Sequence, residues 1–362
     1  MRKTFQYRVY PTRQQIPVLE ELLETARRLY NAALAERRDI YQTTGQSVNY
    51  YAQANQLKTQ RQANPYRARL NFSASQDVLR RLDKAFQAFF RRVKAGEKPG
   101  YPRFRGRNRW DSITFPSYGD GCKIRGERLY LQTVGLLKVK WHRPIGGRIK
   151  TVMIRRQADG WYVCFSCDVE SQSLPPSDVV VGVDLGVRHF ASTSDGEFFA
   201  APQYLRKSER NLKRKQRQIA KSKKGSQRRK KRVRELARLH HHIANQRRDT
   251  AHKVARRLIN TYGLIAFEDL NTKGLLKNHH LAKSIADAGW HQLVTITTAK
   301  AAEAGRQVVL VDARYTSQDC ARCGTRVPKP LSERVHRCPA CGYTQDRDIN
   351  AAENILQRAL AS

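Results

Sequence analysis

The sequence predicts a multidomain α+β protein: a small β-barrel with a helical bundle inserted after its first strand, then an α/β domain with a cysteine-rich insertion. Three observations support this prediction. The first half combines helical patterns with short strand-like segments, and the second half alternates apolar strands with helices. A chain of 362 residues, 40% of them hydrophobic, can also bury more than one core.

The helical bundle is predicted between the first strand and the remaining strands of the barrel. Residues 3–10 are typical of a strand, which Pro11 ends. Apolar residues then recur on one helical face, at Leu19, Leu22, Leu23, Ala26, Leu29, Tyr30 and Ala33. A second helix is expected to bury Val78, Leu82, Ala85, Phe86, Phe89 and Val93. Residues 13–95 therefore predict a bundle inserted after the first strand.

Short β-like segments predict the rest of the barrel, which the first strand could complete. They cover residues 112–115, 129–132, 136–141, 151–155 and 161–169, and turns that contain glycine separate them. The Ser- and Pro-rich stretch at residues 171–176 is the predicted linker to the second half.

The second half has the element order of an α/β domain. An apolar run at residues 179–183, typical of a strand buried on both faces, ends at Asp184. We then expect a hairpin at 190–199, helices at 204–260 with a break at Gly225, a strand at 264–268, a helix at 290–304 and a strand at 308–311. The last helix places Ile349, Ala352, Ile355, Leu356 and Ala359 on one face. This order predicts an RNase H-like fold.

The charge of the chain indicates a polyanionic partner. Lys and Arg number 69 against 31 acids, a net charge of +38 that would repel itself unless a polyanion neutralised it. Lys or Arg fills 17 of the 33 positions from 206 to 238, and only two acids lie among them. We expect this helical hairpin to lie along a phosphate backbone. Its expected contacts include Lys213, Arg214, Arg228, Arg229 and Lys230.

A membrane is the weaker choice of partner. No stretch approaches the roughly 18 apolar residues that a membrane span needs, and the first residues lack the apolar core of a signal peptide. We therefore expect a cytoplasmic protein that binds nucleic acid.

Aromatic rings and cations alternate in the connector at residues 96–109. Tyr101, Arg103, Phe104 and Arg105 could stack on bases and contact phosphates, although an ordinary solvated loop can show the same pattern. We favour nucleic-acid binding.

The cysteines predict a structural zinc site. Cys320 and Cys323 form one C-x2-C pair, and Cys338 and Cys341 form a second. A glycine follows each pair, where a tight turn needs a positive φ, and four thiolates complete a tetrahedron around Zn²⁺. His336 is expected to be a surface group. The remaining cysteines, Cys122, Cys164 and Cys167, are expected to pack without binding metal.

Three acids predict a divalent-metal site. Asp184 and Glu268 each end an apolar strand, and Asp348 stands at the start of the last helix, for which Asp346 is the better N-cap. Carboxylates brought together repel one another unless cations lie between them, and hard oxygen ligands select Mg²⁺ or Mn²⁺. Two ions about 4 Å apart would support phosphodiester hydrolysis. Each acid alone could instead cap a turn, pair with a cation or cap the helix.

Several motifs together resemble the TnpB family, transposon-encoded relatives of type V CRISPR effectors. They are residues 182–186, 267–270, 315–318, the four cysteines with their glycines, and 346–355, with further matches at 10–12, 29–31 and 287–290. The resemblance covers essentially the whole chain.

The resemblance implies a domain plan and a set of catalytic residues. A wedge barrel would occupy residues 1–12 and 110–172, and a helical recognition domain residues 13–109. A RuvC nuclease domain would occupy 173–315 and 345–362, with its acids at Asp184, Glu268 and Asp348. A zinc ribbon would occupy 316–344, and residues 275–290 would form a mobile lid.

The resemblance also implies the partners. A structured guide RNA from the transposon end would pair with double-stranded target DNA, and the protein would read a short adjacent motif. Gln76, Ser112 and Thr114 match that reading site. One copy is expected to act in the RNA complex, at the nucleoid of a prokaryotic cell.

Two alternatives share this architecture. One is a guided DNA-binding repressor without cutting activity, which the loss of an acid would favour, yet all three acids are present. The other is a transposase that joins DNA strands with the same acids and without RNA.

Overall fold

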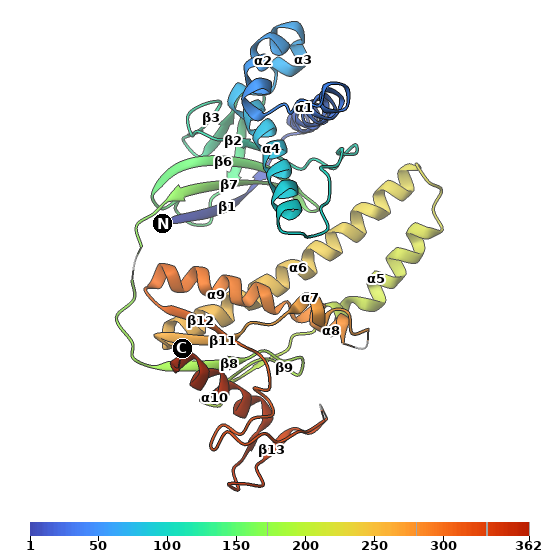
Figure 1. The fold of residues 1–362 in the computed structure, drawn as a ribbon. Coiled ribbons are helices and arrows are strands. Elements are labelled where there is room, and N and C mark those ends of the chain that lie inside the picture. Colours follow the sequence, from blue (N-terminus) through green and yellow to red (C-terminus); the bar gives the residue numbers. More distant parts are fainter. Residues whose placement is uncertain (172, 280, 331, 362) are drawn as a thin grey trace. The chain divides into compact units, whose positions relative to one another are not determined.

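The computed structural model describes residues 1–171, 173–279, 281–330 and 332–361, which form two compact units, Met1–Glu170 and Ser171–Ser362 (Figure 1). The division falls at the start of the predicted linker, of which Gln172 lies outside the described residues. Within those residues, helices both long and apolar enough for a bilayer are absent.

The first unit combines helices with one antiparallel sheet. Its helices are α1 (Gln15–Thr44), α2 (Tyr50–Ala63), α3 (Pro65–Ala68) and α4 (Phe72–Lys94). Its strands are β1 (Arg2–Tyr10), β2 (Ser112–Phe115), β3 (Cys122–Arg125), β4 (Arg128–Leu131), β5 (Gly135–Lys140), β6 (Arg148–Gln157) and β7 (Gly160–Asp168). The strand order is β2-β6-β7-β1-β5-β4-β3. The first strand thus lies in the middle of the sheet, paired with strands from the end of the unit.

The sheet of the first unit is curled but not closed. Figure 1 shows the curl of its long strands, and β2 and β3 are the two ends of the hydrogen-bonded order. The structure therefore has a curled sheet where the sequence predicts a barrel. The helices and the sheet also share one hydrophobic core, to which α1 contributes Leu19 and the sheet Phe165.

Three details of the first unit differ from the sequence prediction. Helix α2 and strand β3 were not predicted, because neither has a strong apolar period. Val93 is 50% exposed, so the prediction that it is buried is wrong. The buried side chains of α4 lie in its first half, from Ala74 to Leu82.

The second unit is a five-stranded mixed sheet with helices on both faces. Its strands are β8 (Val180–Asp184), β9 (His189–Thr193), β10 (Phe198–Ala200), β11 (Leu264–Glu268) and β12 (Gln307–Val311). Its helices are α5 (Tyr204–Ala220), α6 (Gln227–Thr261), α7 (Thr272–Leu275), α8 (Ala282–Ala288), α9 (Trp290–Ala304) and α10 (Arg347–Leu360). The strand order is β10-β9-β8-β11-β12, in which β8, β11 and β12 run parallel.

Alternation along the strands decides which side chains meet which helices. Ile265 and Phe267 of β11 face the core formed with α6 and α9, whereas Ala266 packs with α10 on the other face (Figure 1). Gly182 of β8 also faces α10, since a Cβ added there would lie 1.9 Å from the backbone oxygen of Ala352. A larger residue at this position would therefore push α10 away from the sheet.

The segment between β12 and α10 carries the cysteines. Its strands, β13 (Val335–Arg337) and β14 (Thr344–Asp346), form a small antiparallel hairpin. Helix α10 starts directly after β14, so the hairpin leads straight into the last helix.

Candidate active site and four-cysteine cluster

The three predicted acids come together at one edge of the second sheet. β8 and β11 are parallel neighbours in which Val183 lies beside Phe267, so Asp184 and Glu268 occupy adjacent strand ends. Both follow the alternation that places Gly182 and Ala266 on the α10 face. Asp348 lies in the first turn of α10.

The start of α10 is fixed by a helix cap. The Asp346 carboxylate accepts a hydrogen bond of 2.8 Å from the backbone N–H of Asp348, which confirms the predicted N-cap. This cap defines the direction in which the first turn leaves the hairpin, and with it the position of Asp348.

The pKa values of Asp184 and Glu268 shift in the direction expected for neighbouring carboxylates. Burial raises the pKa of Asp184 well above its usual range, and the negative charges of Glu268 and Asp348 raise it further. Burial also raises the pKa of Glu268, which is 7% exposed, while a hydrogen bond from Thr316 and the charge of Arg358 oppose that rise. The ionised form of these acids is therefore unfavourable when no cation is present.

The surroundings of the acids suit a cation. His189 Nδ1 lies 3.5 Å from Asp348 Oδ2, and Ser192 stands opposite Asp184 in the sheet. Both His189 Nδ1 and Ser192 Oγ are buried and lack a hydrogen-bond partner in the described part of the chain. Buried polar atoms without hydrogen-bond partners, next to carboxylates that repel one another, fit a site that binds a divalent ion.

The carboxylates are spread more widely than the thiols. In the described residues, the four cysteines are the only group of three or more His, Cys, Asp or Glu whose ligand atoms all lie within 4.8 Å of one another.

The four predicted cysteines form a compact cluster. Cys320 Sγ lies 3.7 Å from Cys341 Sγ, and Cys323 Sγ lies 3.5 Å from Cys338 Sγ. Gly324 and Gly342 have φ values of 75° and 72°, as their places in the turns require. Each of these glycines donates its N–H to the carbonyl of the first cysteine of its pair. The donor set fits a tetrahedral zinc ion.

The other predictions around the cysteines have mixed outcomes. Cys122 and Cys167 are buried and Cys164 is half-buried, each within a strand of the first unit. His336, predicted to be a surface group, is fully buried, so that prediction is wrong. Its Nδ1 forms a hydrogen bond with Lys329 Nζ.

Family models match three parts of the chain. A model described as "Probable transposase" matches residues 163–279, and one described as "Cas12f1-like, TNB domain" matches residues 290–355. A "Helix-turn-helix domain" model matches residues 1–46, where this structure has β1 followed by the single long helix α1.

Relatives extend the match to the whole chain. The mimivirus "TnpB-like protein L79" is 30% identical over 37% of this chain and 27% of its own length. A Streptomyces pristinaespiralis protein named "Putative RNA-guided DNA endonuclease" is 32% identical over 100% of this chain and 90% of its own. The chain belongs to the TnpB family. Escherichia coli K12 has a TnpB relative of the same description, InsQ, 31% identical over 98% of this chain and 91% of its own.

The TnpB chain also shares its fold with a solved effector. It aligns with the mini-RNA-guided endonuclease CRISPR-Cas_phi3 at a TM-score of 0.52 and 9% identity, over 99% of this chain and 92% of that one. At this identity the likeness concerns the mixed α/β fold alone.

The three residues predicted to read DNA all belong to the first unit of this TnpB protein, on α4 and β2. The Arg81 guanidinium, on α4, donates to the hydroxyls of Ser112 and Thr114 on β2. Gln76 is half-buried on the same helix. Arg81, which the sequence did not single out, thus holds both hydroxyls and stacks 5.3 Å from the Trp110 ring.

The aromatic connector is exposed, and its rings make edge-to-face and cation–π contacts with the helices. The Tyr101 ring lies 5.5 Å from that of Phe89 and is 46% exposed. The Arg38 guanidinium lies 5.3 Å from the Phe104 ring. Arg103 and Arg105 are exposed, and Asn31 of α1 binds the backbone of Arg105.

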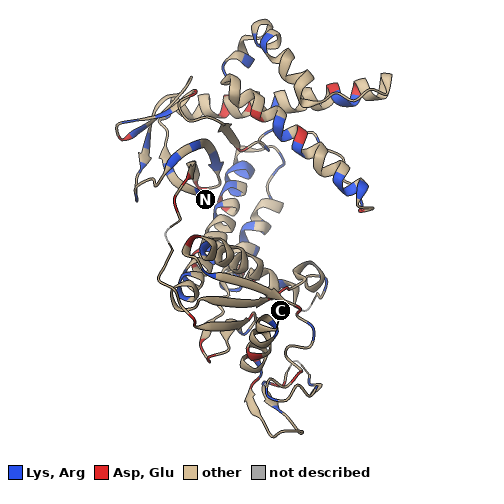
Figure 2. Ribbon diagram, turned by 60° about the vertical axis from the view of Figure 1, so that its left-hand side comes forward, with Lys and Arg blue, Asp and Glu red and all other residues tan. Residues whose placement is uncertain are grey.

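Cations of the α5–α6 hairpin divide into two kinds. Lys213, Arg214, Arg228 and Lys230 are exposed. Arg229 instead donates to the carbonyls of Ile219 and Ser222 and so closes the end of α5, which makes it a structural residue of the hairpin. Figure 2 shows that Lys and Arg are spread over both units.

The C-terminal end of the predicted lid is held by hydrogen bonds to neighbouring elements. Asp287 accepts hydrogen bonds from the backbone of Leu205 and from the Arg247 guanidinium, which ties α8 to α5 and α6. Trp290 Nε1 donates to the carbonyl of Gly186, just beyond Asp184. His280, within the predicted lid, lies outside the described residues.

Proposed function

We propose that this protein is a transposon-encoded, RNA-guided DNA endonuclease that hydrolyses target DNA beside a short motif read by the protein. The observation that carries the proposal is the meeting of Asp184, Glu268 and Asp348 at adjacent ends of two parallel strands and a helix. The names of its full-length relatives support both the guide RNA and the DNA target.

The chemistry proposed for the acids is hydrolysis of a phosphodiester. Mg²⁺ or Mn²⁺ ions held by the three carboxylates would activate a water and stabilise the leaving 3′-oxygen. The protein's own part is to hold its carboxylates in place before DNA arrives. Strand ends fix Asp184 and Glu268, and the Asp346 cap fixes Asp348. Glu268 is buried and Asp184 and Asp348 are half-buried, which would limit access of bulk water.

The domain plan extends this proposal. The order β10-β9-β8-β11-β12 supports an RNase H-like, RuvC-type domain at residues 173–315 and 345–362. The cysteine hairpin supports a zinc ribbon at 316–344, whose filled tetrahedron would be structural. The curled sheet supports a wedge at 1–12 and 110–172, around a recognition bundle at 13–109.

The nucleic-acid contacts are assigned by charge and exposure. The exposed cations of the α5–α6 hairpin, Lys213, Arg214, Arg228 and Lys230, would neutralise phosphates. Tyr101, Arg103, Phe104 and Arg105 would contact an exposed strand by stacking and charge. Gln76 would lie at the DNA motif together with Ser112 and Thr114, whose hydroxyls accept hydrogen bonds from Arg81. One copy of the protein would act with one guide RNA.

Asp184→Ala tests the proposed nuclease. With guide RNA and Mg²⁺, the wild type should cut a plasmid that carries the guide match, and the variant should cut none while binding the target equally well. Asp178→Ala, which removes an exposed acid just before β8, is the control and should cut normally. Parallel loss of target binding in Asp184→Ala would indicate a folding defect and contradict the assignment.

The same assay separates the alternatives. A wild type that binds its guided target but never cuts would be a repressor. Strand joining in the absence of RNA would identify a transposase.

A further inference from the structure

We propose that Thr316 is a positioning residue for the Glu268 carboxylate, and that helix α10 holds Thr316 in place through Asn354 and Arg358. The inference rests on the proposed nuclease function, because Glu268 is one of its three acids. It gives a function to the polar residues Asn354 and Arg358, which the apolar pattern of α10 does not explain.

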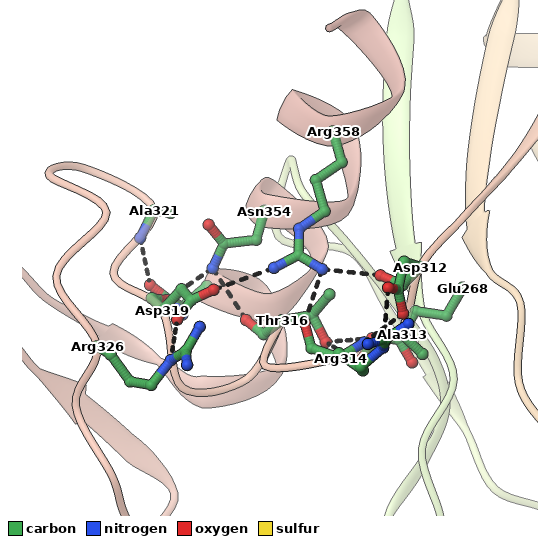
Figure 3. Close-up of polar contacts among 11 residues, drawn as sticks. Glu268, Asp312, Ala313, Arg314, Thr316, Asp319, Ala321, Arg326, Asn354 and Arg358 are labelled. Carbon is green, nitrogen blue, oxygen red and sulfur yellow. Dashed lines mark hydrogen bonds and ion pairs between the residues drawn. The ribbon is translucent and has the colours of Figure 1, made fainter. Parts of the chain in front are cut away.

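Thr316 contacts Glu268 directly. Its hydroxyl donates to Glu268 Oε1, and the two residues are only 3% and 7% exposed (Figure 3). The same hydroxyl also lies 3.3 Å from the carbonyl of Ala313, but its single proton can serve only one acceptor at a time. The shorter contact is with Glu268. A buried carboxylate that lost this donor would be free to rotate and poorly solvated.

Helix α10 binds the backbone around Thr316. Asn354 is 6% exposed, and its side-chain amide donates to the carbonyls of Thr316 at 2.9 Å and Asp319 at 2.7 Å (Figure 3). Asn350, one turn earlier, donates to the same Asp319 carbonyl at 2.9 Å. Both amides are buried, so their hydrogen bonds to this segment are needed to satisfy them.

Arg358 fastens the segment on the side of β12. Its guanidinium donates to the carbonyls of Asp312 at 2.8 Å and Arg314 at 2.7 Å, and to the Asp319 carboxylate at 3.0 Å (Figure 3). A single planar side chain thereby binds three points of the loop that contains Thr316.

Backbone strain next to Thr316 is a second, independent observation. Tyr315 has a φ of 62°, a left-handed conformation that residues with a Cβ rarely adopt. Such a conformation persists when neighbouring contacts impose it, and it clusters at functional sites. Here the contacts from α10 impose it, and the resulting turn aims the Thr316 hydroxyl at Glu268.

One helix therefore relates all three acids to one another. α10 carries Asp348 in its first turn, packs on Gly182 two residues before Asp184, and positions Glu268 through Thr316. The cysteine segment joins the same network, since Asn350 accepts the N–H of Ala321, between Cys320 and Cys323. The geometry of the acid site thus depends on contacts along the length of α10.

Thr316→Val tests the proposal, because valine keeps the shape of threonine and removes the hydroxyl. In single-turnover cleavage, the variant should be about 10–100-fold slower than wild type at limiting Mg²⁺, the usual loss when a metal ligand's own partner is removed. The Mg²⁺ concentration for half-maximal rate should rise. Thr316→Ser, which restores the donor, should recover most of both values.

Thr297→Val is the matched control. Thr297 is a fully buried threonine of α9, on the opposite face of the sheet, and its hydroxyl donates to Leu293 within the helix. This variant should keep the wild-type Mg²⁺ dependence. Guided DNA binding should be equal for all four proteins.

Mn²⁺ binding to the RNA-free protein, followed by electron paramagnetic resonance, separates this proposal from the nuclease assignment. Thr316→Val should bind Mn²⁺ several-fold more weakly, and Thr316→Ser should bind as wild type does. If the wild type cuts no DNA, the nuclease assignment fails, and weakened Mn²⁺ binding would still support the positioning role. Unchanged cleavage and Mn²⁺ binding in Thr316→Val, or equal defects in the Val and Ser variants, would overturn it.

Discussion

Two features of Asp184 disfavour its negative charge when no cation is bound. It ends a strand buried on both faces, and two other carboxylates lie close enough to raise its pKa. A buried charge of this kind costs stability that the fold must recover elsewhere. Under the proposed function, a divalent ion held by the three acids would offset this cost, and its binding would then contribute to the stability of this edge of the sheet.

Asp184→Asn should raise the thermal stability of the second unit in Mg²⁺-free buffer at pH 8. The folded-state pKa of Asp184 is raised, so its contribution to stability is present below the unfolded-state pKa and is lost as pH rises through the folded value. The amide removes that loss, and about 1 kcal/mol would raise the midpoint by roughly 2–4 °C. Calorimetry measures the shift.

The pH dependence tests whether the Asp184 charge causes this difference in stability. At lower pH the difference between Asp184→Asn and wild type should shrink, because the raised pKa of Asp184 makes its carboxyl take up a proton as the pH falls. Added Mg²⁺ should stabilise the wild type at pH 8 and leave the variant unchanged. A variant less stable than wild type at both pH values would contradict the repulsion inferred at this site.

At the scale of elements, the cysteine hairpin and α10 form a continuous structure. The four thiols lie between β12 and α10, and the β13–β14 hairpin leads directly into the helix cap at Asp346. Hydrogen bonds with Thr325 lower the pKa of Cys323 to about 6, which favours the thiolate that a zinc ion requires. A disturbance in the hairpin would therefore reach Asp348 through a short stretch of backbone.

Cys338→Ser should lower bound zinc from about one ion per chain towards none and unfold the hairpin locally, because three thiolates bind the ion less tightly than four. DNA cleavage should fall with it. Inductively coupled plasma mass spectrometry gives the zinc content. Cys167→Ser, a buried cysteine of β7 outside the cluster, should keep its zinc, and full zinc content in Cys338→Ser would refute the ligand set.

At the scale of the whole molecule, charge governs behaviour. A net charge of +38 on 362 residues, with cations in both units, makes a free protein that repels itself and attracts any polyanion. Binding of a guide RNA would neutralise much of this charge and stabilise the protein by mass action. The protein should accordingly be more soluble with its RNA than without it.

Expression with flanking transposon DNA should yield a protein that co-purifies with one RNA species overlapping the 3′ end of its own gene. Sequencing of the bound RNA measures this. The RNA should survive a wash at moderate salt that removes bulk cellular RNA, since specific contacts add to the charge attraction. A random RNA population, removed entirely by that wash, would contradict a dedicated guide.

The local patterns of the sequence predicted the residues of both candidate sites. Cysteine spacing predicted the four-thiol cluster, and apolar strands that end in Asp184 and Glu268 predicted two acids of the candidate active site, because spaced cysteines and strand ends have signatures that neighbouring residues carry. The N-cap at Asp346 was predictable for the same reason. Weakly periodic elements such as α2 and β3 have no such local signature and were missed.

Tertiary structure alone decided how distant side chains meet. The sequence marks α10 by its apolar face, yet its buried Asn354 and its Arg358 bind a loop some 35–46 positions away. His336 is polar and lies in a short hairpin, but packing encloses it. Likewise β1 joins strands at the far end of its unit. Hydrogen bonds between remote segments depend on how the elements pack, and local sequence patterns do not predict that packing.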